Sequence, residues 1–240
     1  MVRDLACPPA DTAFECTKRQ EKEDLQKIEE DDDAHAMVRL AVCYLQNEQE
    51  DDAVDLLEKA AIHGNPEAKN NLAILYANGQ GLEQDVEMAR QLYEESAEGG
   101  CRDAMHNLGI MHDTGRGLPA PDVEAAAYWF AMAADKGHIE ATLAIGLMEM
   151  GGRGTALDVV AAAQRFQYLV EEQDEDTLPK AAFLLGMMHL KGEGVDKDLS
   201  KGLKLITESS DRGSPEAQAW TLEFGPLMEN LALSLDADEV

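Results

Sequence analysis

The sequence predicts an all-α fold, an α/α superhelical solenoid of about five helix-turn-helix repeats with a capping helix at each end. Two observations predict it. Small and large apolar residues recur in a fixed order every 32 to 40 residues, and Gly-x-Gly motifs follow them at a constant offset. The chain is long enough for several such units, because it has 240 residues, of which 45% are hydrophobic.

The first helix of each unit is predicted from an alanine that is followed four residues later by a large apolar residue and then by Ala or Gly. Small side chains at these two positions let neighbouring helices approach closely, while the apolar residue fills the space between them. Neither helix of a unit buries its apolar face alone, so the units must stack. The alanines are Ala36, Ala68, Ala104, Ala141 and Ala181.

The second helix of each unit is predicted from the residues at its two ends. Eleven residues after each of the last four alanines a Gly-x-Gly motif begins, and an aspartate follows as the expected N-cap of the second helix. A closing glycine is expected to end that helix in most units. The aspartates are Asp85, Asp122, Asp158 and Asp198, and the closing glycines are Gly64, Gly100, Gly137 and Gly213.

This order of residues, clearest in residues 104–137, resembles the Sel-like repeat (SLR) family, which is related to the tetratricopeptide repeats. The resemblance implies a solenoid over residues 34–214, in units of about 34–65, 66–101, 102–138, 139–177 and 178–214. In the fourth unit residues 171–177 replace the closing glycine, and we expect the stack to bend or loosen near Gln173.

Both ends of the chain are predicted to be polar caps of the repeat array. Residues 1–33 form an acidic N-terminal part, in which a helix over residues 13–30 has Phe14, Leu25 and Ile28 as its few apolar contacts. Residues 215–240 form a C-terminal capping helix and an acidic tail.

The charge balance excludes some partners. The chain has 20 basic and 48 acidic side chains, a net charge of −28, which repels nucleic acid and anionic lipid. No apolar run approaches the length of a membrane span, and the first residues lack the apolar stretch of a signal peptide, so we expect the chain to start as written. Four unevenly spaced cysteines predict reduced thiols and a cytoplasmic or other reducing compartment.

No catalytic, cofactor or metal site is predicted. The Gly-x-Gly motifs lack the third glycine and the preceding strand of a dinucleotide site, which favours structural turns. The six histidines lack zinc-site spacing, and Cys101 has no identifiable base. The acidic runs at 31–33 and 171–176 are interpreted as solvated charge.

Candidate protein-binding residues lie two and three positions after the alanines. In this architecture the first helices line the concave face, where an asparagine can bond the backbone of an extended peptide with both its donor and its acceptor. The face would be polar near Asn71 and apolar near Phe183; alternatively, the apolar residues pack under the C-terminal helix. The candidates are Arg39, Asn70, Asn71, His106, Asn107, Leu143, Phe183 and Leu184.

The resemblance implies a non-enzymatic protein-protein interaction adaptor or scaffold, and the negative charge favours a partner with a basic or mixed basic and apolar segment. One alternative is a structural subunit of a larger multiprotein complex. Another is a hydrolase of the cysteine-rich repeat type, because some such members of the family have been credited with hydrolysing β-lactams. This chain departs from their paired cysteines. Its C-terminal Asp-Glu-Val could also dock in a carboxylate-capturing groove.

Overall fold

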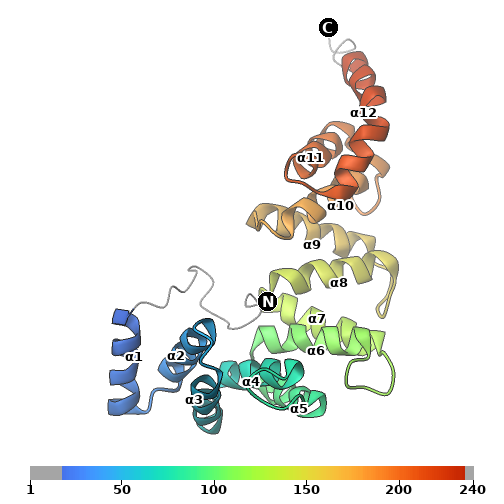
Figure 1. The fold of residues 1–240 in the computed structure, drawn as a ribbon. Coiled ribbons are helices and arrows are strands. Elements are labelled where there is room, and N and C mark those ends of the chain that lie inside the picture. Colours follow the sequence, from blue (N-terminus) through green and yellow to red (C-terminus); the bar gives the residue numbers. More distant parts are fainter. Residues whose placement is uncertain (1–17, 236–240) are drawn as a thin grey trace. The chain divides into compact units, whose positions relative to one another are not determined.

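The computed structural model describes residues 18–235, with side chains described as far as residue 225. Within this range the chain forms twelve helices and no strand, which confirms the predicted all-α class (Figure 1). The chain divides into two compact units, residues 1–133 and 134–240. In the described residues no helix is both long and apolar enough to cross a membrane.

The first unit begins with the helix that precedes the repeats and continues with packed pairs of antiparallel helices, α2 with α3 and α4 with α5. It ends within α7, after Ala133. Its helices are α1 (Lys18–Asp31), α2 (Ala34–Gln46), α3 (Glu50–Ile62), α4 (Pro66–Asn78), α5 (Val86–Glu98), α6 (Arg102–Thr114) and α7 (Val123–Asp135).

The second unit contains two helix pairs, α8 with α9 and α10 with α11, and α12 packs against α10 and α11. A buried cluster that includes Phe166, Leu178 and Leu185 forms its core. Its helices are α8 (Ile139–Gly151), α9 (Val159–Glu172), α10 (Leu178–Lys191), α11 (Leu199–Asp211) and α12 (Pro215–Leu235).

The predicted aspartate N-caps are confirmed. A carboxylate oxygen of Asp85 accepts a hydrogen bond from the amide of Met88 at 2.9 Å, and Asp198 accepts from Lys201 at the same distance. Asp122 and Asp158 cap α7 and α9 in the same way. These bonds satisfy amide groups that have no partner inside the helix, so the aspartates fix where each second helix begins.

The Gly-x-Gly loops are closed by a backbone hydrogen bond that recurs in four units. The amide of the N-cap aspartate donates to the carbonyl of a residue in the last turn of the preceding helix, and in the last repeat this joins Asp198 to His189 at 3.0 Å. Both glycines of that loop are left-handed, with φ of 76° at Gly192 and 75° at Gly194. The glycines therefore have a structural role in the turn. The matching bonds are Asp85 to Tyr76, Asp122 to His112 and Asp158 to Glu149.

Close approach explains the small residues of the first helices. The repeat alanines are fully buried, and a side chain on Gly109 would lie 2.6 Å from the ring of Phe130. Gly146 has the same relation to Phe166 at 2.8 Å. Since real Cβ atoms do not approach so closely, each glycine makes room for a bulky residue of the second helix.

The turn after α9 replaces glycine by polar side chains. Gln173 ends α9 in the left-handed conformation, with φ of 59°, and its side-chain amide donates to the carbonyl of Val170 at 2.8 Å. Asp174 then accepts from the backbone amide and the hydroxyl of Thr177, both at 2.9 Å. The expected bending or loosening near Gln173 stays a prediction.

The helix before the repeats is present, but its apolar contacts were predicted wrongly in part. Leu25 is 40% exposed, whereas Asp24 is completely buried. Phe14 lies outside the described residues. Burial of an aspartate beside an exposed leucine shows that α1 docks through a polar contact.

The cysteines also differ from the prediction in part. Cys101 is free and buried, as expected for a reduced thiol. Cys43 is disulfide-bonded, so the prediction of reduced thiols is wrong at this position. The predicted compartment stays a prediction.

Candidate functional site

Arg39, the first predicted binding residue, is engaged within the chain. Its Nη2 lies 2.6 Å from Oδ1 of the buried Asp24, and its Nε lies 3.2 Å from the same oxygen. The guanidinium therefore holds α1 against α2. The prediction that Arg39 faces a ligand missed this role because Asp24 is distant in sequence.

The predicted asparagines form a chain of side-chain amides. Nδ2 of Asn107 donates to Oδ1 of Asn70 at 3.1 Å, and Nδ2 of Asn70 lies 3.4 Å from Oδ1 of Asn71. Nδ2 of Asn71 is buried and has no hydrogen-bond partner among the described residues. The His106 ring, on the same turn as Asn107, packs on Phe130 with ring centroids 5.6 Å apart.

The expectation that Asn70 and Asn71 are open to a partner is wrong, since their exposed fractions are 1% and 0%. The first helices of successive repeats pack so closely that Asn107 of α6 donates a hydrogen bond to Asn70 of α4. This close packing removes Asn70 and Asn71 from solvent. Asn107 and His106 remain half-buried.

The predicted apolar segment is partly used in packing. Leu143 and Leu184 lie against the core cluster of the second unit, which agrees with the alternative that they are packing residues. Phe183 is half-buried. All three side chains are partly buried, so the apolar surface that they expose is small.

A polar pair in the fourth repeat was missed by the sequence analysis. Nε of Arg165 lies 2.8 Å and 3.1 Å from the two carboxylate oxygens of Glu149. Glu149 occupies the position held by Tyr76 in the second repeat, and Arg165 that held by Leu92. The sequence signal for this pair was a charged residue at a position that an aromatic ring holds in the other repeats, because a buried carboxylate requires a partner of opposite charge.

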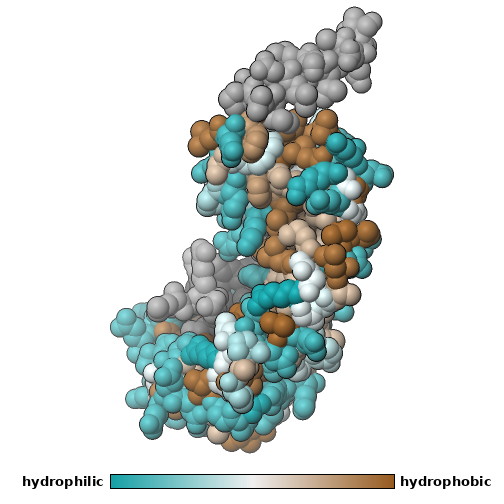
Figure 2. All heavy atoms as spheres, turned by 90° about the vertical axis from the view of Figure 1, so that its right-hand side faces the viewer, coloured by the Kyte–Doolittle hydropathy of each residue, from teal (hydrophilic) through white to brown (hydrophobic). Residues whose placement is uncertain are grey.

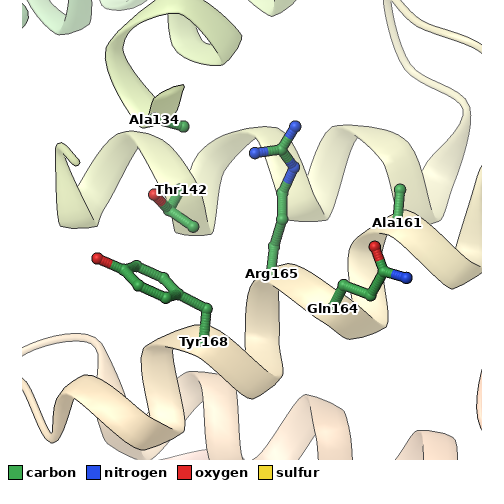
Figure 3. A pocket seen from close by; sticks show the side chains of 6 residues that line it. All are labelled: Ala134, Thr142, Ala161, Gln164, Arg165 and Tyr168. Atoms are coloured by element: carbon green, nitrogen blue, oxygen red, sulfur yellow. The ribbon is translucent and has the colours of Figure 1, made fainter. Parts of the chain in front are cut away.

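This pair lies beside a groove in the second unit, which we call the Arg165 groove. Its volume is about 360 Å³. Figure 3 shows the Arg165 side chain extending from α9 between Thr142 on one side and Ala161 and Gln164 on the other. The groove is lined by Ala134, Thr142, Ala161, Gln164, Arg165 and Tyr168.

Several polar groups of the Arg165 groove have unused bonding capacity. Among the described residues, the two terminal nitrogens of Arg165 have no hydrogen-bond partner, since only Nε contacts Glu149. The side-chain amide of Gln164 is exposed and likewise has none in the described part of the chain. These groups can donate to a ligand, and Gln164 can also accept.

A second groove, of about 410 Å³, lies on the other side of α9, and we call it the His189 groove. It shares Gln164 and Tyr168 with the first groove and adds His189, Val195 and Lys201. Nδ1 of His189 lies 3.1 Å from the carbonyl oxygen of Asp196, which can only accept a hydrogen bond. Nε2 of His189 is buried without a partner among the described residues.

The described residues contain no cluster of three or more His, Cys, Asp and Glu side chains that could hold a metal ion. Burial raises the pKa of the Cys101 thiol, which disfavours the thiolate that a nucleophile needs.

Comparison with solved structures shows the same fold elsewhere. A Sel1 repeat protein from Oxalobacter formigenes has a TM-score of 0.70 and 27% sequence identity, over 77% of this chain and 74% of that one. The protective antigen c5321 of uropathogenic Escherichia coli, which displays an SLR fold, has a TM-score of 0.60 and 24% identity. That match covers 85% of this chain and 52% of c5321. None of the curated proteins compared with the chain matches it.

The family model of the Sel1 repeat matches residues 34–65, 66–101, 102–138 and 179–214, which together are more than half of the chain. The fourth repeat, with the Glu149–Arg165 pair and without a closing glycine, falls between the matched segments. The chain therefore belongs to the Sel1 repeat family.

Proposed function

We propose that this Sel1 repeat protein is a non-enzymatic adaptor or scaffold that binds a segment of another protein. One observation carries the proposal: the recurrent residues of the repeats are used in packing and capping, whereas Gln164 and the terminal nitrogens of Arg165 line a groove without partners in the described chain. A surface of this kind suits recognition of a polypeptide, which offers both donors and acceptors.

Charge supports a basic or mixed basic and apolar partner segment. The net charge of −28 produces a negative field that accelerates encounter with cationic partners and disfavours anionic ones. Figure 2 shows mostly hydrophilic surface over the part of the visible face that belongs to α1 to α5, and larger hydrophobic patches over α8 to α11. A partner with both kinds of residue fits such surfaces.

On the face of the first helices of the repeats, the proposal retains only the accessible predicted residues. Asn107, His106 and Phe183 are half-buried and can contact a partner. Asn71 is completely buried, so its substitution would perturb the fold and is unsuitable as a test of binding. Asn107→Ala is the better variant for this face.

A structural subunit of a larger complex is the second form of the same proposal, in which the partner is permanent. The raised pKa of the buried Cys101 thiol supports a non-enzymatic role over a cysteine-dependent hydrolase. The two forms differ in salt sensitivity, because a permanent interface depends less on long-range charge.

Affinity capture with chemical cross-linking tests the proposal. The full chain is used as bait in an extract of its native source, at low and at moderate salt, beside the Asn107→Ala variant. We expect specific partners that carry basic segments and are reduced at moderate salt. Absence of any specific partner would contradict the proposal, as would turnover of a chromogenic ester or β-lactam that Cys101→Ser abolishes.

A further inference from the structure

The Glu149–Arg165 pair is unusual within this chain and calls for a physical reason. Glu149 has an exposed fraction of 9%, and the Arg165 side chain one of 24%, so both charges are largely removed from water. Ion pairs of this kind contribute little net stability compared with apolar residues of similar volume. The second repeat packs with Tyr76 and Leu92 at the same two positions. Stability alone therefore does not account for the pair.

The pair does orient the guanidinium. Because both carboxylate oxygens of Glu149 contact Nε of Arg165, the side chain is held while its two terminal nitrogens keep four N–H donors. Glu149 also neutralises the positive charge and would repel a second carboxylate. The oriented donors therefore suit neutral acceptors such as the carbonyl oxygens of a peptide backbone.

The exposed side of α9 carries a regular series of side chains. Val160, Gln164, Tyr168 and Glu172 are spaced by four residues and so lie along one face of the helix. Val160 is 52% exposed and Tyr168 is 39% exposed. We call these four residues the α9 ridge; it runs between the Arg165 groove and the His189 groove, which share Gln164 and Tyr168.

The end of the ridge is negatively charged. The last turn of α9 contains Glu171 and Glu172 and no basic residue. Carboxylates at a helix C-terminus add to the negative end of the helix dipole, which is electrostatically unfavourable. Glu172 is exposed and has no ion pair within the described residues. A cation supplied by a partner would relieve this repulsion.

Tyr168 adds a surface for the same cation. The ring lies one turn before Glu172, so a lysine or arginine side chain can lie over the ring and pair with the carboxylate. Aromatic residues exposed beside a groove are frequent anchors of protein interfaces. Chemistry and charge at this end of α9 therefore favour a basic side chain.

We infer that the α9 ridge binds an extended basic segment of the partner protein. This inference rests on the proposed scaffold function and names its site. Backbone carbonyl oxygens of the segment accept from the terminal nitrogens of Arg165 and from Gln164, and a backbone N–H donates to the Gln164 side-chain oxygen. A lysine or arginine of the segment lies on Tyr168 and pairs with Glu172, while an apolar side chain covers Val160.

Fluorescence anisotropy with defined peptides tests the inference. The probes are three short fluorescein-labelled peptides of alternating sequence, in which alanine alternates with lysine, with glutamine or with glutamate. Titration with the full chain at low salt is expected to show the tightest binding for the lysine peptide, weaker binding for the glutamine peptide and none for the glutamate peptide. Binding of the lysine peptide should weaken as salt is added.

Variants assign the binding to the ridge. Gln164→Ala, Tyr168→Ala and the double variant Glu149→Tyr with Arg165→Leu should each weaken the lysine peptide about tenfold or more. The double variant introduces the residues of the second repeat, so we expect its helicity and melting temperature to be retained. Gln91→Ala is the matched control, because Gln91 has the same position in α5, and it should leave binding unchanged.

Equal binding of the lysine peptide to the wild type and all three ridge variants would overturn the inference, as would preference for the glutamate peptide or binding of no peptide. If capture nevertheless finds partners, the scaffold function stands and only the ridge is wrong. If Gln164→Ala changes the sedimentation of the chain itself, a second copy occupies the ridge, which also overturns the inference.

Discussion

Nη2 of Arg39 lies 2.6 Å from a carboxylate oxygen of Asp24, and this ion pair joins α2 to α1. Asp24 is completely buried and its second oxygen has no hydrogen-bond partner among the described residues, while one third of the Arg39 side chain is exposed. The buried carboxylate of Asp24 is thus paired with the guanidinium of Arg39. The same contact joins the N-terminal helix to the first repeat.

Removal of the arginine should therefore destabilise the chain. Arg39→Ala leaves a buried carboxylate unpaired, which is expected to cost about 3 kcal/mol. Urea unfolding measures the loss, and limited proteolysis should show earlier cleavage within residues 18–31. The double variant Asp24→Leu with Arg39→Met removes both charges and should recover most of the stability. A single variant as stable as the wild type would contradict this role.

Gly109→Ala should weaken packing between α6 and α7. The new methyl group would lie 2.6 Å from the ring of Phe130, so the ring or the helices must shift, at an expected cost of about 1 to 3 kcal/mol. Thermal unfolding measures the change. Gly151→Ala is the control, because Gly151 ends α8 with no atom within 4 Å of the added methyl group. That variant should be neutral or slightly more stable, and equal losses in both would refute the packing explanation.

Stability should depend on the ionisation of Glu67. Burial raises the pKa of this carboxyl, with a further contribution from Asp103, against opposing effects of His35 and Arg39. A raised folded-state pKa means that the protonated carboxyl favours the fold, and this stabilisation is lost as the pH rises through that pKa. Glu67→Gln should therefore be more stable than wild type at neutral pH, by less than about 1 kcal/mol given its partial exposure. The gain should vanish below the ordinary pKa of glutamate; a gain that persists there would argue against this cause.

The thiol of Cys101 should react slowly in the folded chain. Burial raises its pKa and shields the sulfur, and both effects reduce the concentration of accessible thiolate. Alkylation with iodoacetamide at mildly alkaline pH, followed by site-specific mass spectrometry, should give at least about tenfold slower modification of Cys101 in buffer than in urea. Rapid modification without urea would revive a nucleophilic role.

Local patterns were predictable because their physical causes act within a few residues. Asp85 and Asp198 cap helices through bonds to amides three residues away, and the positive φ of Gly192 belongs to one turn. The need for a small residue at Gly109 was also predictable from the repeat, although its partner Phe130 became known only from the packing.

Features that depend on distant residues were not predictable in this way. Asn70 and Asn71 are polar in sequence, but their burial depends on how closely α6 approaches α4. Asp24 gave no sign of its burial, since charged residues surround it in the sequence. Glu149 is a charged residue at a position otherwise held by a ring, yet its pairing with Arg165 and the groove beside them required the three-dimensional arrangement of α8 and α9.

Site-directed photo-cross-linking tests the central claim most directly. A photoreactive amino acid replaces Gln164 on α9 in one sample and Gln91, at the equivalent position of α5, in another. After irradiation in an extract of the native source, we predict adducts with a basic segment of a partner protein from position 164, which excess lysine peptide prevents, and none from position 91. Equal adducts from both positions, or adducts from position 91 alone, would contradict the claim that this protein binds its partner along α9.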